Sequence, residues 1–225
     1  MQDYFNSPIF ILGLPRSGTS MIAGSLGICG AWTGSTVRGS PENPKGFFEH
    51  TIIREHVTKK ILAFLKCDPL GVKKLPPVDI QFEAPRLAET IQEILERDGY
   101  QHDMPWLYKD AKLTLLWPTF KRAFPNATWL VVRRDEEGFI NSCLRTRFMK
   151  QHSLDHDFWK KFAEEYQVRI NALKDSGANV LEISSPEVIS GNFEHLKKIV
   201  SQLGLTYREN EVKEFISPTF WHVNS

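Results

Sequence analysis

A short apolar run near the N-terminus leads directly into a glycine-rich turn and then into a helix. Residues 8–12 (Pro-Ile-Phe-Ile-Leu) are apolar without interruption, as in a buried parallel strand. The turn is Gly13-Leu-Pro-Arg-Ser-Gly-Thr-Ser20, and Met21 to Ile28 follow as a helix that Gly30 ends. Because parallel strands require long crossover connections, this order of elements favours a layered α/β fold.

The same alternation continues along the chain. Apolar runs predict further strands at 106–108, 127–132 and 179–183. Apolar periodicity and helix-end signals predict helices at 51–65, 85–97, 112–124, 135–148, 154–173, 193–203 and 210–216. We expect Pro118 to kink or restart the helix at 112–124, and residues 217–225 to be irregular. The fold class is therefore predicted to be α/β, with a P-loop-type parallel sheet flanked by helices on both faces in three layers, in a single domain over residues 1–225.

Composition removes several classes of protein. The chain has 225 residues with 28 Lys and Arg against 27 Asp and Glu, a net charge of +1. Proteins that bind nucleic acid usually carry a broad basic excess, and disordered chains are unbalanced in charge. With 41% hydrophobic residues this chain can form a core. We expect no nucleic-acid partner, and any charge used to bind an anion must be local.

The cysteines and the N-terminus bear on the cellular compartment. The cysteines are three, an odd number without C-x-x-C spacing, which disfavours both a disulfide framework and a zinc site. Residues 1–7 lack the basic and apolar regions of a signal peptide, and no apolar run is long enough to span a bilayer. These features predict a cytoplasmic protein without a membrane span. The oligomeric state is not predicted.

The turn after the first strand has the pattern of a phosphate-binding loop. Glycines allow a tight turn, and the backbone N–H groups at the helix N-terminus attract an anion. A Walker A loop requires Lys after its second glycine, whereas Thr19 stands there and the basic residue is Arg16, inside the loop. An ATPase or GTPase is therefore disfavoured, and an ordinary glycine-rich turn is the simpler alternative.

The segment Pro15-Arg-Ser-Gly-Thr-Ser20 resembles the 5′-phosphosulfate loop of sulfotransferases that use 3′-phosphoadenosine 5′-phosphosulfate (PAPS). It is most similar to the bacterial-type and tyrosylprotein branches of that family. The resemblance assigns five loop residues to cofactor binding: Arg16, Ser17, Gly18, Thr19 and Ser20.

A second similarity lies downstream, where the strand at 127–132 runs into Arg133 and Arg134. Ser142 follows Arg134 by eight residues. In sulfotransferases an Arg at a strand end and a Ser at this spacing hold the 3′-phosphate, and the resemblance gives Arg134 and Ser142 this role. Arg matches a phosphate because its guanidinium is a planar, permanently charged fork. Arg133 has the poorer spacing, and a solvent-facing pair of arginines is the alternative.

The resemblance also implies catalytic residues. The segment 43–49 resembles the bacterial-type Asn-Pro-x-Gly-x-x-Glu pattern, which makes Glu49 the expected base. Lys109, after the strand at 106–108, and Arg16 would stabilise the transferred group. His50 is the reserve candidate for the base and Asp110 a weaker third. Alternatively, Glu49 only stabilises the start of the helix at 51–65.

Three hypotheses follow from these residues. The first is an enzyme that transfers a sulfuryl group from PAPS to a hydroxyl or amine of a small-molecule or carbohydrate acceptor, releasing 3′,5′-adenosine bisphosphate without a metal. The second is a P-loop nucleotide kinase or NTPase, and the third is a non-catalytic nucleotide-binding module. The family's residues for adenine recognition are not matched: Met21 replaces a Trp after the loop, and no C-terminal Arg-Lys-Gly clasp is found.

Overall fold

The computed structural model describes residues 4–41 and 43–216. Within them the strands form one parallel sheet in the order β2-β1-β3-β4. The strands are β1 (Ile9–Gly13), β2 (Leu107–Lys109), β3 (Thr128–Arg133) and β4 (Asn179–Ser184). In the register, Ile9 lies opposite Leu107 on one side and Thr128 on the other, and Thr128 lies opposite Asn179. All four predicted strands are confirmed to within a few residues.

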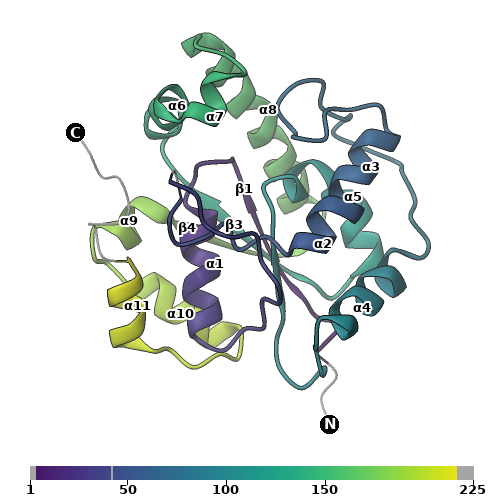
Figure 1. The fold of residues 1–225 in the computed structure, drawn as a ribbon, viewed down its shortest axis with the longest axis vertical. Coiled ribbons are helices and arrows are strands. Elements are labelled where there is room, and N and C mark those ends of the chain that lie inside the picture. The colour runs from purple at the N-terminus through teal and green to yellow at the C-terminus, as the bar shows by residue number, and fades with distance from the viewer. Residues whose placement is uncertain (1–3, 42, 217–225) are drawn as a thin grey trace.

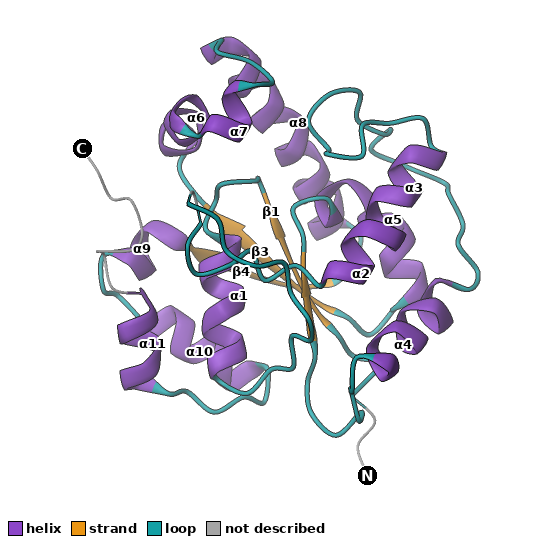
Figure 2. Cartoon of the chain, in the orientation of Figure 1, coloured by secondary structure: helices purple, strands orange, loops and turns teal. Residues whose placement is uncertain are grey.

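Helices connect the strands and cover the sheet (Figure 2). They are α1 (Thr19–Ile28), α2 (Thr51–Ile53), the π-helical turn η1 (Arg54–Thr58), α3 (Lys59–Phe64), α4 (Leu87–Arg97), α5 (Leu113–Ala123), α6 (Glu136–Arg145), α7 (Arg147–Lys150), α8 (His156–Asp175), α9 (Ser185–Ile189), α10 (Glu194–Gln202) and α11 (Glu209–Ile216). Within the described residues, no helix has the length and apolar character needed to cross a membrane.

Alternation of side chains along the central strands creates two separate cores. From β1, Phe10 and Leu12 enter a core shared with α3, α4, α5, α6 and α8. Ile9 and Ile11 point to the opposite face and pack with α1, α10 and α11. Figure 1 shows these two groups of helices on opposite sides of the sheet. The predicted three-layer α/β fold is confirmed.

The structure differs from the sequence prediction at several helices. Helix α5 continues through Pro118, because burial of Leu115, Leu116 and Phe120 outweighs the loss of one backbone hydrogen bond. The helix predicted at 135–148 is divided into α6 and α7 at Thr146, whose backbone is extended. Helix α9, which begins with Ser185 and Pro186, was not predicted. The irregular segment predicted at 217–225 lies outside the described residues.

Candidate active site

The expected site residues lie at one edge of the sheet. Because all strands are parallel, the ends of β1, β2 and β3 place Gly13, Lys109 and Arg133 at the same edge. The chain passes from β1 to β2 on one side and returns to β3 on the other, so β1 stands at the topological switch point. Open α/β sheets bind their ligands outside the carboxyl ends of the strands at such a point.

The loop between β1 and α1 is shaped by two glycines. A Cβ atom on Gly13 would lie 2.5 Å from the carbonyl oxygen of Val132, so the loop passes too close to β3 for any side chain there. Gly18 has a φ of 90°, and a Cβ on it would lie 2.7 Å from Cβ of Ser185 in α9. The close approach of these neighbours explains why glycine occupies both positions.

Thr114 of α5 fixes the start of the loop. Its hydroxyl accepts a hydrogen bond from Gly13 N (3.2 Å) and donates one to Gly13 O (3.1 Å). Residues 13 and 114 are far apart in sequence, and a threonine within an apolar helix gives no sign of such a contact. Thr114 is therefore a supporting residue that the sequence analysis missed.

The hydroxyl groups of the loop differ in their surroundings. Ser17 is fully buried, and its Oγ has no hydrogen-bond partner within the described part of the chain. Ser20 donates its hydroxyl proton to Phe47 O (3.1 Å) and accepts from Nδ2 of Asn43 (3.3 Å). Thr19 is buried at the start of α1. Ser17 thus fits a bound anion, whereas the Ser20 hydroxyl ties α1 to the segment that leads to Glu49.

The two expected anion sites lie next to each other. Arg16 Nε donates to Ser142 Oγ in α6 (3.3 Å), and Arg134 Nη1 donates to Arg16 O (3.0 Å). Burial lowers the pKa of Arg134 from its usual value, although Asp135 opposes the shift. Residues 16, 134 and 142 come from three distant parts of the sequence, so the fold brings together the groups that the motif assigned to two phosphates.

The surroundings of Arg134 leave it little room. A Cβ on Gly138 of α6 would lie 3.0 Å from Arg134 Nε, so the glycine provides the space that this side chain occupies. Behind it, Cys143 is fully buried. Burial raises the pKa of the Cys143 thiol to about 12 despite the positive charges of Arg16 and Arg134. Cys143 is therefore an uncharged, buried neighbour of these two arginines.

Arg133 has different partners from its neighbour Arg134. Its Nε and Nη2 donate to the two carboxylate oxygens of Glu182 at 3.1 and 2.8 Å. Its Nη1 donates to Oε1 of Gln167 at 3.0 Å. This fork joins β3 to β4 and α8, which is a structural role. The adjacent arginines therefore offer a matched pair for experiment.

Glu49 and Lys109 form an ion pair at the end of β2. Lys109 Nζ donates to Glu49 Oε1 at 2.8 Å, and both side chains are largely buried. The second carboxylate oxygen, Oε2, lies 2.7 Å from Nε of Arg54. Arg54 was not singled out in the sequence, where it looks like one more polar residue of the helix at 51–65. Both oxygens of the expected base are thus in contact with a cation.

His50 has a structural position. Its Nδ1 accepts a hydrogen bond from Ile53 N at the start of α2, and its Nε2 lies 3.2 Å from Asp98 Oδ2. The side chain is only 2% exposed, and its ring stacks on Trp32. Burial lowers the pKa of His50, although Asp98 raises it in part. Capping the start of α2 and facing Asp98 account for these contacts, so the structure gives His50 a structural explanation.

Asp110 is the centre of a buried polar network next to Lys109. Its carboxylate accepts a hydrogen bond from the hydroxyl of Tyr108 (2.8 Å), and it lies 3.2 Å from Thr58 Oγ1 and 2.8 Å from Lys112 Nζ. Burial alone would raise the pKa of Asp110, but the charge and hydrogen bonds of Lys112, together with the charge of Lys109, outweigh it and lower the pKa. Asp110 therefore anchors the end of β2.

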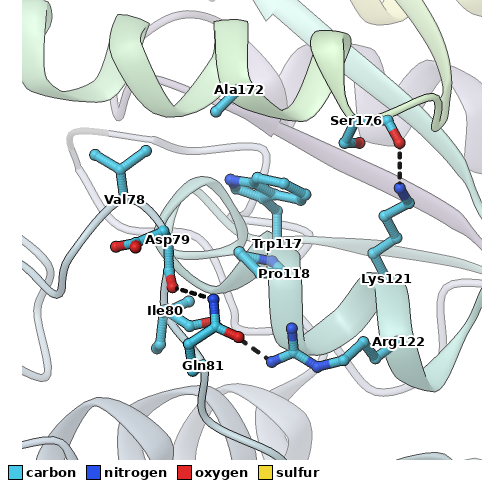
Figure 3. A pocket seen from close by; sticks show the side chains of 10 residues that line it. All are labelled: Val78, Asp79, Ile80, Gln81, Trp117, Pro118, Lys121, Arg122, Ala172 and Ser176. Atoms are coloured by element: carbon cyan, nitrogen blue, oxygen red, sulfur yellow. Dashed lines mark hydrogen bonds between the residues drawn. The ribbon is translucent and has the colours of Figure 1, made fainter.

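A cavity of about 490 Å³ lies elsewhere in the fold (Figure 3). Its walls come from residues 78–81, the second half of α5 and the end of α8. Figure 3 shows Lys121 reaching Ser176 O, and Arg122 donates to the carbonyls of Ile80 and Phe82. Lys121 follows Thr114 by seven helical residues, which places it about 10 Å further along α5 from the loop. The cavity is therefore not part of the candidate site.

Among residues 4–41 and 43–216, no group of three or more His, Cys, Asp or Glu side chains lies close enough to hold a metal ion.

Comparisons with known proteins give one family. The model of a sulfotransferase family matches residues 8–209. No curated protein matches the chain in sequence.

Solved structures resemble the fold at low sequence identity. Sulfotransferase STF1 from Mycobacterium tuberculosis H37Rv matches with a TM-score of 0.56 at 15% identity, covering 97% of this chain and 74% of that one. The sulfotransferase domain of the olefin synthase from Synechococcus PCC 7002 matches with a TM-score of 0.56 at 16% identity, covering 90% and 75%. The sulfotransferase domain from the curacin biosynthetic pathway matches with a TM-score of 0.55 at 15% identity, covering 94% and 80%. These similarities show a shared fold.

Proposed function

The chain belongs to the sulfotransferase family, and we propose that it transfers a sulfuryl group from PAPS to a hydroxyl or amine of a small-molecule or carbohydrate acceptor. The product would be 3′,5′-adenosine bisphosphate. The observation that carries the proposal is the contact between Arg16, Arg134 and Ser142, at 3.3 and 3.0 Å. A 3′-phosphate separates PAPS from ATP, and a second basic group beside the phosphate loop is what such a ligand requires.

The residues present fit this donor. The loop amides and the N-terminus of α1 would hold the 5′-phosphosulfate, together with Arg16, Ser17 and Thr19. The buried Ser17 Oγ without a partner supports this fit, because a buried polar group is costly unless it is hydrogen-bonded. Ser20 would contribute its backbone N–H, since its hydroxyl proton is donated to Phe47 O. Arg134 and Ser142 would hold the 3′-phosphate.

The donor supplies an activated sulfuryl group, and the residues of this chain would stabilise the transferred group and accept the proton of the acceptor. Sulfuryl transfer resembles phosphoryl transfer, in which cations stabilise charge on the equatorial oxygens. Arg16, in the loop after β1, and Lys109, at the end of the adjacent strand β2, would provide those cations. Glu49 would accept the proton of the acceptor while Lys109 and Arg54 hold its carboxylate. None of these roles calls for a metal ion.

Ligand-dependent thermal stability tests the proposal against an ATP-using enzyme. Unfolding is followed with 3′,5′-adenosine bisphosphate, ADP or ATP–Mg present at increasing concentration. A ligand at a hundredfold excess over its Kd stabilises the folded state by about 2.7 kcal/mol, so saturable stabilisation is expected for the bisphosphate. Stabilisation by ATP–Mg alone would refute the proposal and favour a kinase or NTPase.

Transfer itself separates an enzyme from a binding module. We expect Glu49→Gln to lower the rate of sulfate transfer by about 10²–10⁴-fold, the usual contribution of general base catalysis. Bisphosphate binding should persist in this variant, because Glu49 contacts Lys109 and Arg54 rather than the phosphate loop. An unchanged transfer rate would exclude Glu49 as the base.

A further inference from the structure

Arg54 holds the oxygen of Glu49 that Lys109 does not. Lys109 Nζ lies 2.8 Å from Oε1, and Arg54 Nε lies 2.7 Å from Oε2. We propose that Arg54 is a positioning residue that fixes the orientation of the Glu49 carboxylate for the transfer reaction. This inference rests on the proposed function.

The exposed fraction of the side chain increases from Lys109 to Glu49 to Arg54. Lys109 is 4% exposed, Glu49 12% and Arg54 26%. With Lys109 alone, the carboxylate could rotate about its single bonds and present either oxygen. A second cation at the other oxygen restricts this rotation. The Arg54 N–H is not aligned with the oxygen as in a good hydrogen bond, so the contact acts mainly through charge.

The local backbone sets where Arg54 stands. Arg54 begins the π-helical turn η1, and such turns occur frequently at functional sites. Thr58, at the other end of η1, donates its hydroxyl to Arg54 O (3.0 Å) and lies within hydrogen-bond reach of Asp110 Oδ2 (3.2 Å). Since Asp110 directly follows Lys109, the turn is tied to the strand end that carries the other cation. The side chains of Arg54 and Lys109 are therefore held in fixed positions relative to each other.

Lys59 provides a matched control. Arg54 and Lys59 both form ion pairs with Glu55, and both lie in the same helical segment. Lys59 Nζ contacts the Glu55 carboxylate at 2.7 and 2.8 Å, and among the described residues Glu55 is its ion-pair partner. Arg54→Met and Lys59→Met each remove one positive charge and one partner of Glu55. Only the first removes the contact with Glu49.

The test compares these variants in transfer from PAPS to 4-nitrophenol, glucose or glucosamine, with bisphosphate affinity measured by calorimetry. Arg54→Met should lower kcat by about 10- to 100-fold, the scale of a small misplacement of a reacting group. Arg54→Lys should restore part of the rate. Bisphosphate affinity should stay within about twofold, and Lys59→Met should behave as the wild type.

The outcomes separate this inference from the proposed function. If the wild type is active and Arg54→Met has the same kcat as Lys59→Met, the role of Arg54 is overturned while the proposed function stands. A wild type that neither binds the bisphosphate nor transfers sulfate overturns the proposed function, and the role of Arg54 with it. If the wild type binds the bisphosphate but transfers sulfate too slowly to follow, the role of Arg54 is tested by a double-mutant cycle of Glu49→Gln and Arg54→Met. The cycle compares the free energies of unfolding of the variants in urea. Additive effects overturn the inference, and coupling supports it.

Discussion

Replacing Arg134 should weaken binding of 3′,5′-adenosine bisphosphate while leaving the fold intact. Arg134 is half-buried beside the phosphate loop, with Nη1 on Arg16 O at 3.0 Å. A hydrogen bond to a charged group contributes about 1.5–3 kcal/mol, which corresponds to a rise in Kd of about 10- to 150-fold for Arg134→Ala. Partial burial reduces solvent screening and favours the upper half of that range.

The neighbouring arginine is the control. Arg133 binds Glu182 and Gln167 on the far side of β3, so Arg133→Ala should keep bisphosphate affinity within about twofold. That variant should lose at most about 1 kcal/mol of stability, because its ion pair is partly exposed. Both variants are compared by calorimetry at constant ionic strength.

A second ligand shows how Arg134 acts. Adenosine 5′-phosphate lacks the 3′-phosphate but would bind the same loop through its 5′-phosphate. If Arg134 binds the 3′-phosphate, Arg134→Ala should weaken the binding of the bisphosphate far more than the binding of the monophosphate. Equal losses for both nucleotides would mean that Arg134 only supports the loop through Arg16 O. Equal effects of Arg133→Ala and Arg134→Ala would refute the assignment outright.

Other substitutions test separate parts of the site. Ser20→Ala should cost about 1 kcal/mol of stability in urea unfolding but leave bisphosphate affinity nearly unchanged. Ser17→Ala should leave the stability of the free protein unchanged and raise the Kd of the bisphosphate, measured by calorimetry, about tenfold or more. The reverse pattern would contradict the assignment of the two hydroxyl groups. Gly18→Ala should cost about 1–3 kcal/mol, because φ is 90° and the new Cβ would meet Ser185; an unchanged Tm would show that the loop relaxes. Burial lowers the pKa of His50, so the unfolded chain binds a proton first and stability falls as the pH drops below about 6.5. His50→Asn keeps a helix-capping acceptor without that titration, so its Tm should fall less between about pH 7.5 and pH 5.5; an equal fall would place the pH dependence elsewhere.

Local sequence signals were sufficient for the architecture. The two central strands are largely apolar runs, and alternate residues of such a run serve the two faces of the sheet, as Ile9 and Phe10 do. Helix ends were predictable where capping was local: Asp135 accepts a hydrogen bond from Gly138 N at the start of α6. The juxtaposition of Arg16, Arg134 and Ser142 followed from strand ends that share one edge of the sheet.

Long-range contacts were beyond the sequence. Nothing near Thr114 indicates that its hydroxyl binds Gly13, and nothing near Ser185 indicates that it packs on Gly18. The π-helical turn that sets the position of Arg54 changes the helical period by one residue, which apolar spacing within 51–65 does not reveal. The motif also assigned Ser20 as a ligand, whereas its hydroxyl is engaged by Phe47 and Asn43.

A crystal structure with bound 3′,5′-adenosine bisphosphate tests the central proposal most directly. The account predicts the 5′-phosphate on the backbone amides of residues 16–20 and the 3′-phosphate within hydrogen-bond distance of Arg134 and Ser142. A bisphosphate bound with its 3′-phosphate away from both residues, or bound outside the carboxyl edge of the sheet, would contradict it.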